Sequence, residues 1–291
     1  MNINDKKLLQ WHPAFYAGLQ IEFGEESAKL IFEREHNLST KPMQIDVLVI
    51  KKCTNDVINK NIGRIFRKHN IVEYKSPDDY LSINDFYKVY GYTCFYKSET
   101  EVIESIKITD VTITFVSRGY PRELSKHLTK TRGFSLEKRG EGIYYITNDI
   151  IPMQLLVTSE LSEEENLWLR CLTNNLQDIK TIDKLSVRYS ENEHNELYKS
   201  VMNVIVRANR DKFKEVTSMC EALKELWAED IEKSHNEGME KGYEMGHQDG
   251  IRRMIISGKE LGASKKQIEE LLVRNYDITI EQARMYIEQN W

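Results

Sequence analysis

Along the first 160 residues, short apolar runs of strand length alternate with longer segments whose apolar side chains recur at helical spacing. The predicted strands, in chain order, are residues 29–38, 43–52, 70–76, 111–117 and 153–159, with a further hairpin over residues 134–147. The predicted helices are residues 14–26, a short one near residues 61–68, one that begins at Ser82 and a basic one over residues 121–130. Because strands and helices alternate, we predict an α/β fold with a mixed central sheet flanked by helices.

From about residue 160 onward the apolar side chains keep helical spacing, so we predict an all-α C-terminal region. The chain then divides into an α/β domain over residues 1–160, a helical domain over residues 161–234 and a tail over residues 235–291. Two capping boxes predict where short helices of the tail begin: Ser264 with Gln267, and Thr279 with Gln282.

Four glycines, Gly238, Gly242, Gly246 and Gly250, stand at intervals of four residues. In a helix they would form a bare stripe that lets a second helix approach, whereas the cost of about 1 kcal/mol for each internal glycine also allows a flexible hinge. We favour the helix and expect a homo-oligomer that forms through the C-terminal helices. A helix-turn-helix over residues 258–289 is a weaker alternative, because its second helix carries one basic residue.

The formal net charge of the 291-residue chain is −5 at pH 7, which argues against a protein that simply coats nucleic acid. The charge is uneven, however: residues 51–75 and 118–139 are strongly basic, and residues 221–249 are acidic. A phosphate-binding face in the N-terminal half would give this distribution, and so would two solvated basic surfaces that never meet.

The four cysteines have none of the paired spacing that builds a zinc site or a disulfide framework, so we expect ordinary buried thiols at Cys53, Cys94, Cys171 and Cys220. No apolar run has membrane-spanning length, and the N-terminal residues MNINDKKLLQ lack the apolar stretch of a secretory signal. We therefore expect a cytoplasmic protein with no membrane partner.

Charged residues interrupt two of the predicted strands. Asp46 lies within the apolar run MQIDVLVIKK, where an ionised carboxylate without partners would cost several kcal/mol. In NIVEYKS, Glu73 and Lys75 are two positions apart and so project from the same face of the strand. These three groups could satisfy one another as a structural ion-pair network.

A more specific interpretation is a magnesium site. Mg²⁺ prefers oxygen ligands and is usually held by one or two carboxylates together with substrate phosphate. Asp46 and Glu73 supply two carboxylates from adjacent strands, and the main-chain carbonyl of Tyr74 could add a third oxygen. Lys75 could then orient or help deprotonate the attacking water and offset the charge that develops on the phosphate.

The helix with a glutamate, the hairpin with Asp46, the strand IVEYK and the helix that follows resemble the PD-(D/E)XK nuclease superfamily. The segment IVEYKSPDD and the glycine repeat are similar to its transposase-associated, recombination-promoting-nuclease-like members. The resemblance covers about residues 12–118 and implies a restriction-endonuclease-like core. Ile45 stands where the motif has proline, and the helix after the lysine strand offers Tyr87, Lys88 and Tyr92 but no glutamine.

The resemblance implies a role for each of four residues. Asp46 and Glu73 would hold the metal, Lys75 would be the catalytic lysine, and Glu22 would be the helix carboxylate that assists the metal or its water. Glu26 is the rival of Glu22, which we prefer because it lies nearer the apolar stripe of its helix.

We therefore predict a DNA endonuclease that uses Mg²⁺, or Mn²⁺ in its place, cuts phosphodiester bonds with low sequence specificity and takes part in transposition or recombination. Backbone phosphates would be bound by basic residues near the catalytic strand: Lys51, Lys52, Arg64, Arg67, Lys68 and Lys88. The alternative is a weakly active or inactive nuclease-like module that binds or regulates and assembles through its helical C-terminal half.

Overall fold

The computed structural model describes residues 9–33, 48–53, 56–98, 105–215 and 221–291, and of residues 214–215 and 221–237 only the backbone. The chain forms two compact units, residues 1–224 and residues 225–291. Asp46 and the turn STKP lie outside the described residues.

The first unit is built on a mixed seven-stranded sheet with the strand order β1-β2-β3-β4-β7-β6-β5, which confirms the predicted α/β class. The strands are β1 (Leu30–Glu33), β2 (Leu48–Lys52), β3 (His69–Tyr74), β4 (Val111–Ser117), β5 (Ser135–Gly140), β6 (Ile143–Thr147) and β7 (Met153–Val157). Both predicted hairpins form, as β1 with β2 and β5 with β6. The restriction-endonuclease-like core stays a prediction.

The central strands β3, β4 and β7 run parallel, so their carboxyl ends share one edge of the sheet, which we call the carboxyl edge. Ligands of open α/β sheets bind outside this kind of edge. Because β2 is antiparallel to β3, its last residues lie at the opposite, amino edge, where Lys51 is paired with His69. All seven residues of β4 are buried, as expected of a strand covered on both faces.

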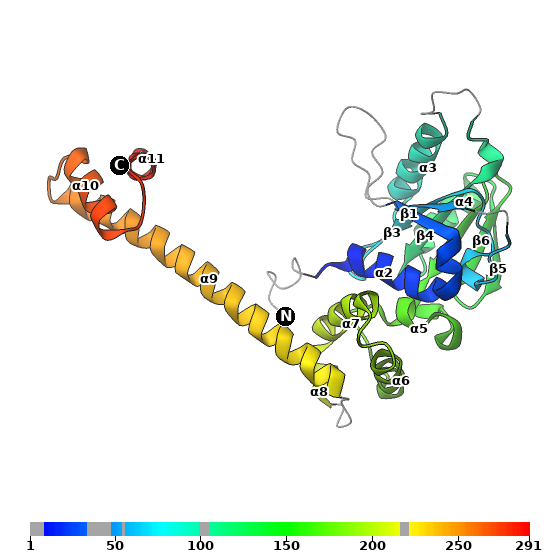
Figure 1. Cartoon of the computed structure of the whole chain (residues 1–291). Coiled ribbons are helices and arrows are strands. Elements are labelled where there is room, and N and C mark those ends of the chain that lie inside the picture. The colour runs from blue at the N-terminus through cyan, green and yellow to red at the C-terminus, as the bar shows by residue number, and fades with distance from the viewer. Residues whose placement is uncertain (1–8, 34–47, 54–55, 99–104, 216–220) are drawn as a thin grey trace. The chain divides into compact units, whose positions relative to one another are not determined.

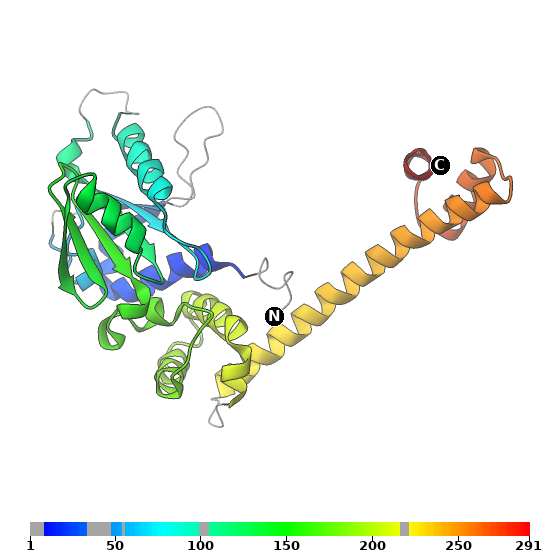
Figure 2. The ribbon, with the colours of Figure 1, turned by 180° about the vertical axis from the view of Figure 1, so that it is seen from behind.

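Three helices cover the two faces of the sheet: α2 (Trp11–Phe23), α3 (Ile83–Ser98) and α4 (Arg122–Lys130). The helices α3 and α4 lie side by side on one face (Figure 2), where Phe86 and Leu124 join a core cluster with Ile71 of β3. Alternate side chains of β3 point to the other face, which α2 covers. There the ring of Phe15 stacks on that of Tyr74 with the centroids 4.1 Å apart.

Four further helices of the first unit are α5 (Glu163–Cys171), α6 (Ile179–Ser190), α7 (Glu196–Ala208) and α8 (Arg210–Glu215). Short 3-10 helices are η1 (Gly24–Lys29), η2 (Asn61–Gly63), η3 (Ile108–Asp110) and η4 (Thr158–Glu160). The helices α5 and α7 pack on α2, below it in Figure 1. Most of residues 161–234, the predicted helical domain, lies in the first of the two compact units, and the predicted three-part division stays a prediction.

The second unit contains most of the long helix α9 (Glu221–Glu260), together with α10 (Lys265–Asn275) and α11 (Ile280–Asn290). Both predicted capping boxes are present, at the starts of α10 and α11. The glycine repeat lies within α9, as we predicted, but a methyl group added at Gly238, Gly242 or Gly246 would meet nothing within 4 Å. Of the four repeat glycines only Gly250 has a close neighbour among the described residues, since a methyl there would lie 2.6 Å from the hydroxyl of Tyr276.

The cysteine environments differ in part from the prediction. Cys171 is buried, but Cys53 and Cys94 are exposed, because Cys53 follows the end of β2 and Cys94 lies on the outer side of α3. Cys220 lies outside the described residues. None of the helices described here combines the length and the apolar composition needed to cross a membrane.

Gly142, in the turn between β5 and β6, gives a test of this packing. It has a left-handed φ of 67°, and a Cβ there would lie 2.6 Å from the carbonyl oxygen of Val157 and 2.7 Å from the amide nitrogen of Leu161. Gly133 has a similar φ of 69° with nothing within 4 Å. We expect Gly133→Ala to lower the free energy of unfolding by about 1–2 kcal/mol through backbone strain alone. Gly142→Ala should cost roughly 1–3 kcal/mol more through the clash. Urea unfolding monitored by circular dichroism measures both, and equal losses would contradict the tight contact with β7.

Candidate active site

Glu73 and Lys75 lie at the carboxyl edge of the sheet, on the face that α3 covers. The strand β3 is paired on both sides, with β2 and with β4, and the amide of Lys75 still donates to the carbonyl of Val116 at 2.9 Å. The pairing therefore holds the backbone on either side of Glu73 and fixes the direction of both charged side chains. Pro77, which has no N–H to donate, follows two residues later.

The ammonium group of Lys75 lies between two carboxylates. Its Nζ is 2.9 Å from Oε1 of Glu73 and 2.9 Å from Oδ1 of Asp85. The side chain of Glu73 is 10% exposed and that of Lys75 is 20% exposed, so the network is largely removed from water. We call these three residues the carboxyl-edge triad.

Asp85 is a member that the sequence reasoning missed. It lies in the first turn of α3, where its Oδ2 accepts hydrogen bonds from the amide nitrogen of Ser82 at 2.8 Å and from its hydroxyl at 2.7 Å. This reciprocal capping arrangement leaves Oδ1 directed at Lys75. The Ser-x-x-Asp spacing at the predicted helix start was the available signal.

Burial and charge shift the pKa of each member of the triad. Burial raises the pKa of Glu73, against the hydrogen bond and positive charge of Lys75. Burial disfavours the ammonium of Lys75, but hydrogen bonds and charge from Asp85 and Glu73 outweigh it, so the pKa of Lys75 is raised. Burial also acts against the Asp85 carboxylate, yet the hydrogen bonds from Lys75 and Ser82 hold the pKa of Asp85 below its usual value. Lys75 is therefore a protonated hydrogen-bond donor at neutral pH and not a general base in this arrangement.

Tyr74, between the two charged residues, points to the other face. Its ring is buried against Phe15 and His12 and so packs on the face opposite Glu73 and Lys75. Its hydroxyl has no hydrogen-bond partner among the described residues, and burial raises the pKa of Tyr74. The side chain of Tyr74 thus anchors β3 to α2, which leaves only its main-chain carbonyl for the ligand role we predicted.

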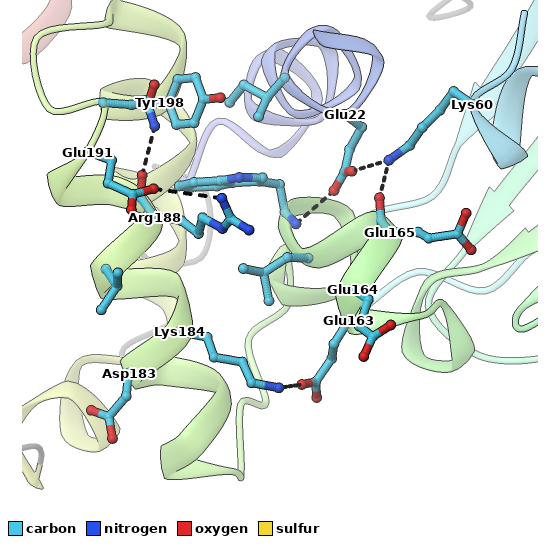
Figure 3. Close-up of a pocket in the computed structure, with 15 residues that line it drawn as sticks. Glu22, Lys60, Glu163, Glu164, Glu165, Asp183, Lys184, Arg188, Glu191 and Tyr198 are labelled. Atoms are coloured by element: carbon cyan, nitrogen blue, oxygen red, sulfur yellow. Dashed lines mark hydrogen bonds and ion pairs between the residues drawn. The ribbon is translucent and has the colours of Figure 1, made fainter.

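Glu22 lies on α2 and so on the face opposite the triad. Its Oε2 is 2.9 Å from Nζ of Lys60, and its Oε1 accepts hydrogen bonds from the amides of Trp168 at 2.8 Å and Leu169 at 3.2 Å (Figure 3). Those amides are available because α5 is interrupted at Asn166, which has the non-helical values φ −139° and ψ 45°. Burial raises the pKa of Glu22, against the charge of Lys60. The structure therefore does not bring Glu22 together with Glu73 and Lys75.

The rival helix carboxylate also has local partners. Glu26 accepts hydrogen bonds from the amides of Asn59 at 3.0 Å and Lys60 at 2.9 Å. Both glutamates thus fix the segment at residues 59–60. A cavity of about 920 Å³ lies beside Glu22 between α2, α5, α6 and α7, with Trp168 and Tyr198 in its wall (Figure 3). It is on the α2 side of the sheet and contains none of the triad.

The predicted metal site is described only in part. Asp46 lies outside the described residues, so its distance from Glu73 is not defined. Within the described ranges no group of three or more histidine, cysteine, aspartate or glutamate side chains is placed to hold a metal ion. The carboxylate of Glu73 and the carbonyl of Tyr74 are the two predicted ligand groups that the structure describes, and both are oxygen donors of the kind Mg²⁺ prefers.

Most of the predicted DNA-binding residues are engaged by the protein itself. Lys51 pairs with Glu33 at 2.6 Å and Lys68 with Asp110 at 2.9 Å. Nε of Arg64 donates to the carbonyl of Asn59 at 3.1 Å, and Arg67 donates to that of Thr109. Lys51, Lys52, Arg67 and Lys68 lie at or next to the amino edge, away from the triad. Among the predicted DNA-binding residues, Lys88 on α3 lies near Glu73. The positive charge of Lys88 acts to lower the pKa of Glu73.

Comparison of the chain with protein-family models, with curated proteins and with solved structures finds no match. The chemistry of the carboxyl-edge triad is therefore argued from its own geometry.

Removal of the Lys75 ammonium should leave two largely buried carboxylates without their positive partner and so destabilise the folded protein. At pH 7 we expect Lys75→Met to lower the free energy of unfolding by about 1–3 kcal/mol, less than for a fully buried pair because the side chains are partly exposed. The pKa of Glu73 is higher in the folded state than its ordinary value of 4.5. At pH values just above 4.5 the folded protein therefore binds more protons than the unfolded protein, and the free energy of unfolding falls as the pH rises. The loss should therefore be smaller near pH 4.5 than at pH 7 in urea unfolding.

The double variant Glu73→Gln/Lys75→Met is the control for this effect. Without an ionisable group at position 73 it should recover most of the stability at pH 7 and show a weaker pH dependence. A Lys75→Met loss that is the same at both pH values would argue against the assigned charge state of Glu73.

Proposed function

We propose that this protein is a DNA endonuclease that uses Mg²⁺, or Mn²⁺ in its place, and hydrolyses phosphodiester bonds with little sequence preference. The observation that carries the proposal is the Glu73–Lys75 pair on a central strand at the carboxyl edge, oriented by Asp85 of the following helix. The element order α2, β1, β2, β3, α3, β4 supports it, because it follows the order of the superfamily that the sequence resembles. A role in transposition or recombination is part of the proposal and rests on that resemblance.

In this proposal Asp46, Glu73 and the carbonyl of Tyr74 would hold the metal ion. When bound, Mg²⁺ supplies a positive charge that polarises the phosphate and lowers the pKa of bound water. Lys75 contributes a fixed ammonium group that donates a hydrogen bond and stabilises the negative charge growing on the phosphate.

The charge state of Lys75 narrows its role. Because its ammonium group is paired with both Glu73 and Asp85, Lys75 is assigned the stabilisation of charge on the phosphate and not the deprotonation of water. Asp85 acts through Lys75 and is a positioning residue. Its side chain is held by Ser82, so it can keep the ammonium group directed toward the site.

Nicking of supercoiled plasmid with Mg²⁺ tests the catalytic assignment. We expect Lys75→Ala and Glu73→Gln to reduce the initial nicking rate at least about 100-fold, the usual effect of removing a charge-stabilising group. The matched controls are Lys266→Ala and Glu141→Gln, which change the same charges at exposed positions and should nick as the wild type does. Equal rates for Lys75→Ala and the wild type would rule out the proposal.

The second candidate is a nuclease-like module that binds or regulates without cutting. It is favoured by the closed geometry of the triad, in which Lys75 already has two carboxylate partners, and by the net charge of −5. In that case the triad is an ion-pair network that joins β3 to α3.

Metal titration separates the two candidates. A ligand at 100 times its Kd stabilises the folded state by about 2.7 kcal/mol, so saturating Mg²⁺ or Mn²⁺ should raise the melting temperature of a competent nuclease by several degrees. We expect this rise in the wild type and in the control Asp277→Ala, but not in Asp46→Ala. A melting temperature that neither Mg²⁺ nor Mn²⁺ changes would favour the binding module.

A further inference from the structure

A row of three cations runs along the exposed side of α4. The helix buries Leu124, Ser125 and Leu128 against the sheet and turns Arg122, Lys126 and Lys130 to solvent. Positions four apart lie on one side of a helix, with a rise of about 6 Å between them. We call these three residues the α4 cation row.

The cations of the row have no ion-pair partner among the described residues, whereas most of the predicted DNA-binding cations interact with other groups of the protein. In the described part of the chain Arg122, Lys126 and Lys130 have no ion pair and no side-chain hydrogen bond, whereas Lys51 and Lys68 are neutralised by Glu33 and Asp110. A cation that keeps its full charge and exposure attracts phosphate more strongly than one already paired.

A further cation and several aromatic rings lie where α4 ends and where it meets α3. Arg132 follows α4, with its guanidinium 5.1 Å from the ring centre of Phe134 and 5.6 Å from that of Tyr90. Its charge is partly balanced by Asp149 at 3.8 Å. The ring nitrogen Nε2 of His127 is 2.9 Å from the hydroxyl of Tyr87, so α4 is also tied to α3.

The row begins next to the candidate active site. Both α3 and α4 start at the carboxyl edge, because each follows a parallel strand that ends there. The loop after Lys75 touches the first turn of α4, where the amide of Glu123 donates to the hydroxyl of Tyr80 at 3.3 Å. In Figure 2 the two helices lie side by side.

We propose that the α4 cation row binds the phosphate backbone of duplex DNA that passes the carboxyl edge; the choice of DNA rests on the proposed nuclease function. A regular line of unpaired cations suits a polyanion with evenly spaced charges. The amino-edge cations are poorer candidates, because Lys51 and Lys68 are already paired with Glu33 and Asp110. Since the whole chain is negatively charged, attraction has to come from a local surface of this kind.

Fluorescence anisotropy with a labelled 30-base-pair duplex in EDTA tests the row without any cleavage. The row variant is Arg122→Gln/Lys126→Gln/Lys130→Gln, and its matched control is Lys51→Gln/Arg67→Gln/Lys68→Gln, which removes the same residue types and the same charge. At 100 mM salt we expect the row variant to bind at least about 10-fold more weakly, with a salt slope about 2–3 shallower. The control should change the affinity less than about twofold.

Folding is monitored by the far-UV circular dichroism and melting temperature of each variant. The single reversal Lys126→Glu is a second variant that leaves the rest of α4 intact, and it should also weaken binding severalfold. Equal losses in the two triple variants, unchanged binding by the row variant, or a wild type that binds no duplex would each overturn the proposal.

The nicking assay keeps this outcome separate from that of the proposed function. Binding that depends on the α4 cation row, without nicking, would contradict the proposed nuclease activity and support the proposed DNA-binding role of the row. Nicking by a protein whose row variant binds and cuts as the wild type does would leave the nuclease and remove the row.

Discussion

The ammonium group of Lys75, held between Glu73 and Asp85, is the interaction on which the carboxyl edge depends. Two largely buried carboxylates of like charge would each disfavour ionisation of the other, and the charge of Asp85 does raise the pKa of Glu73. Lys75 makes both charges tolerable at once, and in doing so it joins the end of β3 to the first turn of α3. The apolar residues Phe86 and Val89 of α3 pack in the core on the same face of the sheet.

A second buried glutamate–lysine pair, Glu22 with Lys60, lies on the other face of the sheet. Its contacts are those of a pair that joins parts of the fold, and they can be compared with those of Glu73 and Lys75. Both carboxylate oxygens of Glu22 are taken, one by Lys60 and the other by two amides of the interrupted helix α5. Lys60 also donates to the carbonyl of Glu165. This pair joins three separate segments and faces no parallel strand end. The pair of Glu73 and Lys75 lies instead at the edge where open α/β sheets bind ligands, which is why we assign the chemistry there.

The element types could be predicted because their signals are local. Residues 111–117, VTITFVS, are rich in β-branched side chains and form β4 with the predicted ends, and the two capping boxes of the tail start α10 and α11. The partners of Glu22 could not be predicted, since Trp168 is 146 positions away and is available only because α5 breaks at Asn166. Asp85 was hidden for a related reason: its spacing signals a helix cap, and only the tertiary structure turns its second oxygen toward Lys75.

The position of the basic residues follows from the direction of β2 relative to β3, which the predicted hairpin of β1 with β2 does not fix. An antiparallel β2 carries Lys51 and Lys52 to the amino edge, so charge that is close to Glu73 in sequence is far from it in the sheet. At that edge Glu33 and Asp110 neutralise two of the cations. The helix that leaves β4 begins at the carboxyl edge instead, and its exposed cations keep their charge. A chain with a net charge of −5 can therefore still present unpaired positive charge beside its candidate active site. Acidic residues such as Glu33 and Asp110 pair with cations at the amino edge and not with those of α4.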